Sequence, residues 1–167
     1  MTTMPKAEVT LPSDSEVKVV RRFKAPRALV YKAYTTPALM QRWLVGYPGW
    51  IMHVCDMDVR VGGQFRWRWR SEEGQEFGFF GEFREVSAPS RFVHTEYFDA
   101  GTMGGDMGEG ALITVELTEQ DRVTTLVTLM DFGSKQSRDA ALATGMTDGM
   151  ESSYQVLDGV LAAERAA

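Results

Sequence analysis

The strongest constraint on the fold is the central region, residues 50–131, in which short apolar segments alternate with turn sequences. Six segments are rich in β-branched or aromatic residues: 50–58, 64–70, 76–86, 91–98, 111–119 and 122–131. The breaks between them are rich in Gly, Ser, Pro and Asp. Most breaks are too short for a helical crossover, so we expect consecutive strands to pair as antiparallel hairpins.

Helical patterns lie on both sides of this region. A first strand is expected at Glu16–Phe23, followed by two short helices that begin at Pro26 and Pro37. From Lys135 to about Glu164 the period becomes helical, with Ser134 as a candidate N-cap. Its apolar face comprises Leu142, Met146, Met150, Tyr154, Leu157 and Leu161. One helix cannot bury such a face alone, so we expect an α+β protein whose curved, seven-stranded antiparallel sheet wraps around this long C-terminal helix.

Length and composition favour one soluble domain. A chain of 167 residues suits a single domain, expected at residues 16–164, with residues 1–15 as a flexible polar tail. No apolar run approaches the roughly 18 residues that a membrane span needs, and no secretory signal is recognised at the N-terminus. A lone cysteine, Cys55, excludes an intramolecular disulfide. The expected location is the cytoplasm.

The segment GGQFRWRWR, residues 62–70, mixes arginine and tryptophan as nucleic-acid-binding strands do. A hairpin that sets Arg70 opposite Glu76 separates the two residue types, because side chains alternate across a strand. One face then carries Phe65, Trp67, Trp69, Phe77 and Phe79. The other carries Arg66, Arg68 and Arg70, where Arg70 can form an ion pair with Glu76 and Arg66 can stack on Phe80. Charges and rings on opposite faces cannot contact one ligand, and the net charge is −5. Nucleic acid is therefore not an expected partner.

Four stretches carry a family resemblance: KAPRALVYKAYTTPALMQRWL, DMDVRVGGQFRW, SRFVHTEYFD and SRDAALATGMTDGMESSYQVLDGVL. From about residue 16 to 164 the chain resembles bacterial proteins related to the C-terminal domain of the Hsp90 ATPase activator Aha1. These belong to the START-like, or Bet v 1-like (SRPBCC), superfamily. The resemblance implies a helix-grip fold that encloses a deep, mainly apolar cavity. Superfamily members carry lipids, hormones or polyketides, and some catalyse cyclisation or hydrolysis.

The expected cavity wall combines inward aromatic residues with the apolar face of the helix. The candidates are Trp43, Trp50, Trp67, Trp69, Phe79, Phe83, Glu96, Met146, Met150 and Tyr154. Methionines facing an aromatic wall suit adaptable apolar recognition. For each residue alone, plain core packing is the simpler interpretation. Glycines precede both methionines within the helical pattern, at a cost of roughly 1 kcal/mol each against alanine, which points to a packing or space requirement.

Two polar residues, His94 and Glu96, share one face of the segment FVHTEYFD. If that face points inward, they could orient a polar ligand group or act as general acid and base. The alternative is a solvated face, and it is slightly preferred. His53 and Cys55 lie two residues apart, but no second pair at metal-ligand spacing accompanies them, so no metal or cofactor is expected. The glycine-rich loop 100–110 lacks a phosphate-binding motif, so we interpret it as a flexible loop, and a role as a lid beside the cavity mouth is a hypothesis.

These observations favour binding of a small apolar or amphipathic molecule, with no membrane insertion. Two alternatives stay open. One is a chaperone cofactor of the Hsp90 type, or another protein-interaction module. The other is a cyclase or hydrolase that uses Glu96 and His94. A homodimer that pairs through the outer face around Phe80 is also considered.

Overall fold

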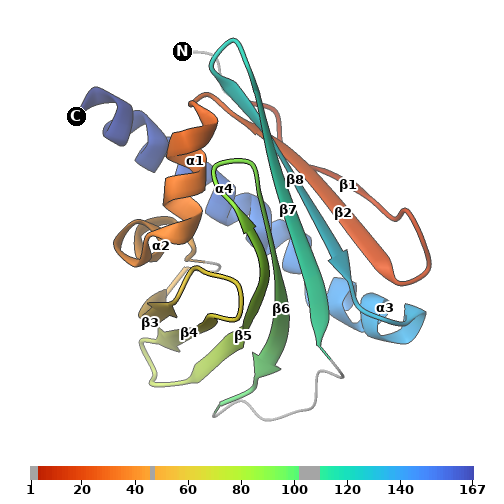
Figure 1. Cartoon of the computed structure of the whole chain (residues 1–167). Helices are drawn as coiled ribbons and strands as arrows, with labels where there is room; N and C mark the ends of the chain where they lie inside the picture. Colours follow the sequence, from red (N-terminus) through yellow and green to blue (C-terminus); the bar gives the residue numbers. More distant parts are fainter. Residues whose placement is uncertain (1–3, 46–47, 102–109) are drawn as a thin grey trace.

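The computed structural model describes residues 4–45, 48–101 and 110–167, and within these ranges it has one eight-stranded sheet and four helices (Figure 1). The strands are β1 (Glu8–Thr10), β2 (Glu16–Phe23), β3 (Trp50–Met57), β4 (Gln64–Ser71), β5 (Glu76–Ser87), β6 (Arg91–Asp99), β7 (Ala111–Gln120) and β8 (Val123–Asp131). The helices are α1 (Arg27–Thr35), α2 (Pro37–Trp43), α3 (Lys135–Ala143) and α4 (Met146–Ala166). None of the helices in these ranges is long and apolar enough to cross a membrane.

The sheet is antiparallel throughout, in the order β1-β2-β8-β7-β6-β5-β4-β3. Strand β2 lies beside the last strand, β8, and helices α1 and α2 carry the chain from β2 to β3 at the opposite edge. Figure 1 shows α4 running across the curved sheet, with α1 and α2 near its C-terminal half. The inner face of the sheet and α4 therefore enclose the core.

Alternating burial explains why β2 and β8 form neighbouring strands on this core. On each strand every second side chain is buried, and the register sets buried residues of the two strands opposite each other. The opposed pairs are Val17 with Met130, Val19 with Thr128, Arg21 with Leu126, and Phe23 with Thr124. A shift of one residue would turn every apolar side chain toward solvent, so this pattern determines the register.

The hairpin β4–β5 has the predicted register. Arg70 lies opposite Glu76 and Trp67 lies opposite Phe79, so the tryptophans are buried while Arg66 and Arg70 are exposed. The ion pair between Arg70 and Glu76 is present at 4.0 Å. On the outer face, Arg66 pairs with the Asp99 carboxylate at 3.6 Å instead of stacking on its neighbour Phe80. The prediction that rings and charges separate is confirmed.

Two features of the expected architecture were wrong. The sheet has eight strands, because Glu8–Thr10, within the expected tail, pairs with β2. All three of its residues are exposed, so no alternation marks them as a strand. The expected long C-terminal helix is two helices, α3 and α4. They are separated at Gly145, whose φ of 80° lies in the left-handed region that glycine adopts without strain.

Both short helices are present, although Pro26 is the N-cap of α1 and the helix itself begins at Arg27. Pro37 occupies the first turn of α2, and the indole N–H of Trp43 donates to the Ala33 carbonyl oxygen of α1 at 3.0 Å. Ser134 caps α3 by accepting a hydrogen bond from the Ser137 N–H. The expected lid, residues 100–110, falls mostly on residues 102–109, which lie outside the described residues.

Candidate functional site

The inner face of the sheet is sealed at one end and accessible at the other. Toward α1 and α2 the inward side chains are almost completely buried, as Trp43, Phe83 and Leu157 illustrate. At the opposite end several side chains face inward by strand or helix periodicity and yet are only half-buried. We call this set the open end: Trp50, Phe77, Phe79, Glu96, Phe98, Met146 and Met150. These inward-facing side chains therefore keep accessible surface that their counterparts at the sealed end do not have.

An aromatic wall lines the sheet side of the open end. The Trp69 and Phe77 rings stack with centroids 5.2 Å apart, and Trp50 meets the edge of Phe77 at 5.1 Å. Phe79 and Phe98 are in edge contact at 5.4 Å. These are preferred aromatic geometries, so the wall is ordered by its own contacts. The indole N–H of Trp69 donates to the Leu44 carbonyl oxygen at 2.8 Å, which fixes that ring further.

His94 of β6 lies in the sealed part, enclosed by rings. Its imidazole meets the edges of Phe65, Trp67 and Phe83 and stacks on Phe92, with centroids 4.9 to 6.0 Å apart. Its Nδ1 lies 3.0 Å from the Thr95 carbonyl oxygen, which only accepts, so Nδ1 donates and Nε2 is left as an acceptor. Burial lowers the pKa of His94 to about 4, so this histidine is neutral at pH 7.

Glu96 lies two residues further along the same face of β6, opposite Ala111 of β7. Residues at this spacing are about 6.6 Å apart along a strand, so Glu96 lies between His94 and the aromatic wall. Burial raises the pKa of the Glu96 carboxyl to about 7. Among the described residues no basic side chain pairs with it. The preference for a solvated orientation was wrong, because Phe92 and His94 on this face are buried.

Tyr154 of α4 belongs to a structural hydrogen-bond network. Its hydroxyl shares hydrogen bonds with Thr128 of β8 and Tyr34 of α1, and burial raises its pKa to about 12. Its ring meets the edge of Phe23 at 5.6 Å. This network joins α4 to the sheet and α1. Tyr154 therefore anchors the helix, while Met150, one turn earlier, and Met146, two turns earlier, face the open end.

The expected cavity residues thus divide into two groups. Trp43, Trp67, Phe83 and Tyr154 are buried in the core. Those at the open end or bordering it are Trp50, Trp69, Phe79, Glu96, Met146 and Met150. Phe77 and Phe98 complete the aromatic wall and were not among the expected site residues. The alternation that placed Phe79 and Glu96 inward could have identified both.

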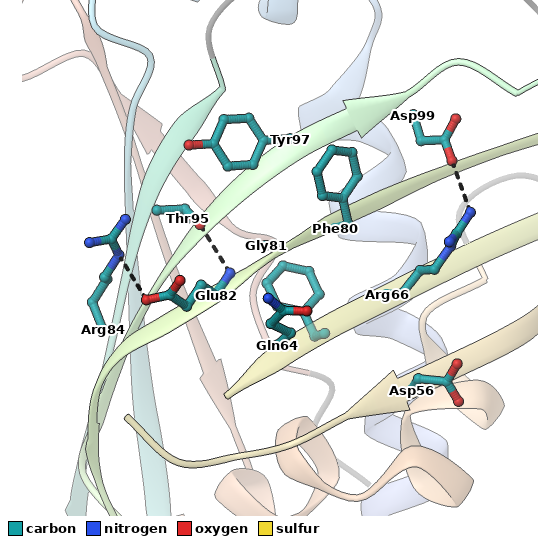
Figure 2. Close-up of a pocket in the computed structure, with 11 residues that line it drawn as sticks. Asp56, Gln64, Arg66, Phe80, Gly81, Glu82, Arg84, Thr95, Tyr97 and Asp99 are labelled. Atoms are coloured by element: carbon teal, nitrogen blue, oxygen red, sulfur yellow. Dashed lines mark hydrogen bonds and ion pairs between the residues drawn. The ribbon is translucent and has the colours of Figure 1, made fainter. Parts of the chain in front are cut away.

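A second concave feature, the outer groove, lies on the other face of β3–β6 (Figure 2). It has a volume of about 650 Å³ and is lined by Asp56, Gln64, Phe65, Arg66, Phe80, Gly81, Glu82, Arg84, Thr95, Tyr97 and Asp99. Phe80 and Tyr97 stack at 5.5 Å, and both rings are exposed. Gly81 contributes backbone to the lining of the groove. Charged side chains of both signs surround it (Figure 2).

A curved antiparallel sheet packed around a C-terminal helix, with an aromatic inner face, defines an α+β protein built to enclose an apolar interior. The family comparison agrees with this class. The chain belongs to the family described as Activator of Hsp90 ATPase homolog 1-like protein, whose model matches residues 24–162. The resemblance drawn from the sequence is confirmed.

Solved structures show the same architecture. A protein from Rhodobacter sphaeroides is 30% identical, with a TM-score of 0.87 over 95% of this chain and 99% of its own. A protein from Mycobacterium smegmatis, 21% identical, gives a TM-score of 0.82 over 94% and 97% of the two chains. An AHSA1-like protein from Aeromonas hydrophila, 18% identical, gives 0.66 over 85% and 92%. The last two show the fold alone. No match was found among curated proteins.

Proposed function

We propose that this protein binds a small apolar or amphipathic molecule between the sheet and α4, at the open end. The observation that carries the proposal is the partial exposure of side chains that face inward. A fold of the Bet v 1-like type supports it, because that architecture is suited to enclosing an apolar ligand. Apolar side chains that fold inward without complete burial keep part of their hydrophobic free energy unrealised, at roughly 25 cal/mol per Å². A ligand that covers them would gain that free energy.

The two walls of the site differ in stiffness. The aromatic wall is held by ring contacts and by the Trp69 hydrogen bond to Leu44. Met146 and Met150 on α4 are unbranched and polarisable, so they adjust to the shape of a bound molecule. A rigid wall facing an adaptable one suits a family of related ligands more than one exact shape.

A substitution that fills the open end with a larger side chain tests whether a ligand binds there. Met150→Trp places a larger ring in the open end, whereas Val156→Trp places the same ring on the exposed face of α4. The probe is N-phenyl-1-naphthylamine, a neutral dye whose fluorescence rises in apolar surroundings. We expect saturable binding to the wild type and to Val156→Trp, and at least tenfold weaker binding to Met150→Trp. Absence of saturable binding to the wild type, or an equal loss in both variants, would reject the open end as the site.

The outer groove favours a second candidate function, a protein-interaction module. Phe80 and Tyr97 form an exposed aromatic stack, and aromatic residues are enriched where proteins bind one another. Arg66 and Arg84 at the rim alternate with acidic side chains, which suits a polypeptide surface of mixed charge. The family description names an Hsp90 activator, so a chaperone of that type is the partner to examine first.

Replacing both stacked rings tests whether the outer groove is a protein-interaction surface. The double variant Phe80→Ser/Tyr97→Ser should weaken binding to a purified Hsp90-type chaperone by tenfold or more, as measured by surface plasmon resonance. Leu112→Ser, another exposed apolar residue on the outer face, serves as the control and should leave binding within twofold. If the wild type does not bind, or if both variants bind as the wild type does, the groove is not the chaperone surface.

A further inference from the structure

We infer that the open end takes an organic cation, an amine or quaternary ammonium that carries an apolar group, and that Glu96 is its counter-ion. This inference rests on the proposed function and specifies the chemical class of its ligand. It is carried by the position of one carboxyl group against an aromatic wall, where the described residues offer it no positive charge.

The surroundings of Glu96 are aromatic on the sheet side. Phe98 follows it on the same face of β6, and Phe79 of β5 meets the Phe98 ring at 5.4 Å. Phe77 lies 6.2 Å from Phe98 and stacks on Trp69. Ring faces attract cations, and the attraction is stronger where the site is desolvated. A carboxylate beside such rings is the pairing that recognises ammonium groups and discriminates against anions.

No internal cation already compensates Glu96 in the described part of the chain. The buried Arg21 is bound by Glu151 and Asp158, both on α4. The buried Arg138 of α3 donates to the Asp139 carboxylate and to a backbone carbonyl oxygen in the N-terminal segment. Burial is the cause of the raised pKa of Glu96, with no charged neighbour contributing. The missing partner is therefore a positive charge, which a ligand can supply.

The other titratable groups near the interior do not change ionisation around neutral pH. On the strands they are His94, with a pKa lowered to about 4 by burial, and Cys55, with a pKa raised to about 11 chiefly by burial. On the helices they are Tyr31, Tyr34 and Tyr154, all with raised pKa values. The pKa of Arg21 is raised by its two carboxylate partners, and Arg21 in turn lowers the pKa of Glu151. The inner faces of β5 and β7 beside Glu96 carry apolar residues only.

Among these interior groups only Glu96 changes its ionisation near neutral pH, so the affinity for a cation should depend on pH in a characteristic way. A cation binds the ionised form of Glu96, whose fraction rises about tenfold between pH 6 and pH 8 for a pKa of about 7. Affinity for a cation should therefore increase with pH. A neutral ligand that accepts a hydrogen bond from the protonated carboxyl would show the opposite trend.

Calorimetric titration of three probes with one scaffold tests the inference: 4-phenylbutylamine, 4-phenyl-1-butanol and 4-phenylbutanoate. The amine stays positively charged from pH 6 to pH 8. We expect it to bind at least tenfold more tightly than the alcohol at pH 8, with a Kd that falls about tenfold from pH 6 to pH 8, and we expect the anion to bind most weakly. Glu96→Gln should abolish the preference for the amine and its pH dependence while alcohol binding is retained. Glu116→Gln, on the exposed outer face of β7, should change neither.

The failures of the two proposals can be distinguished. If the naphthylamine dye binds but the alcohol binds as tightly as the amine, or the amine loses affinity as pH rises, the cation inference is overturned and the apolar site stands. If the amine keeps its preference in Glu96→Gln, Glu96 is not the counter-ion. If the dye does not bind either, the open end is not a ligand site and both proposals fall.

Discussion

The Arg21 guanidinium on β2 donates two hydrogen bonds of 3.0 Å to the two oxygens of the Asp158 carboxylate on α4. Glu151, two turns earlier on the same helix, accepts two more, at 3.1 and 3.3 Å, and also a bond from the Ala7 N–H. The Arg21 carbon Cζ lies 5.1 Å from the centre of the Phe23 ring. This arginine therefore holds α4 and the N-terminal segment against one edge of the sheet. The same helix carries Met146 and Met150 of the open end.

Removing both partners of Arg21 should destabilise the protein strongly. Glu151→Gln together with Asp158→Asn leaves a guanidinium that is 2% exposed without a counter-charge. Breaking a buried ion pair costs about 3–5 kcal/mol, because the remaining charge stays desolvated. We expect a loss in that range in the free energy of unfolding, measured with urea. Part of the Asp158 side chain reaches solvent, so Asp158→Asn alone should cost less.

A surface ion-pair network provides the matched comparison. Arg91 pairs with Glu85 and Glu116 at 3.0 and 2.7 Å, but all three side chains are more than a third exposed. Arg91→Gln should therefore change the free energy of unfolding by at most about 1 kcal/mol. Equal costs for the two sets of substitutions would show that burial of Arg21 does not govern its contribution.

Glu96 should make the protein less stable as pH rises. Its pKa is about 7 in the folded state and about 4.5 in the unfolded state, so the folded state holds the proton more tightly. The penalty is absent below pH 4.5, grows between pH 4.5 and 7, and reaches roughly 3 kcal/mol above pH 7, at about 1.36 kcal/mol per pKa unit. Glu96→Gln should be more stable than the wild type at pH 8, by up to this amount, and equal to it at pH 4.5. A pH-independent difference in urea denaturation would contradict the assignment.

His94 should act in the opposite direction. Its pKa is about 4 in the folded state and about 6.5 in the unfolded state, so protonation favours unfolding. Its contribution is complete above pH 6.5 and is lost as the pH falls toward 4, by roughly 3 kcal/mol. His94→Phe keeps a ring in the aromatic cluster but cannot be protonated, so its stability relative to the wild type should rise as pH falls over this range. If urea midpoints at several pH values show a constant offset, His94 is not buried in the neutral form.

The sequence predicted the parts of the fold that depend on alternation. On β4 every second residue is aromatic and the others are arginine, so only one register with β5 satisfies both faces, and the structure has that register. The site residues that follow from it, Trp69 and Phe79, were placed correctly on the inner face. In these strands the free-energy cost of turning a ring toward solvent or a charge into the core is large, so the local pattern determines which face each side chain takes.

Other parts depend on contacts that a local pattern does not contain. In β6, His94 and Glu96 are polar and yet face inward. Their orientation follows from the pairing of β6 with β5, where Phe83 lies opposite His94 across an irregular register. The short strand β1 has no buried residue and exists only because β2 offers it an edge. The outer groove includes the Phe80–Tyr97 stack, whose two rings are brought together by β5 and β6 and are far apart in sequence.

Two glycines should respond in opposite ways to substitution by alanine. Gly159 is exposed in the middle of α4, and a Cβ there would meet no atom within 4 Å. Gly159→Ala should stabilise the protein by about 0.5–1 kcal/mol, because alanine loses less backbone entropy in a helix.

At Gly81 a Cβ would overlap the Thr95 backbone carbonyl and crowd the Phe65 ring, neither of which can yield without moving β6 or the core. Gly81→Ala should lower the free energy of unfolding by at least about 2 kcal/mol, by the cost of overpacking. Thermal and urea denaturation of both variants would check this pair. A neutral effect at Gly81 would mean that β5 and β6 are less closely paired beside Thr95 than the structure has them.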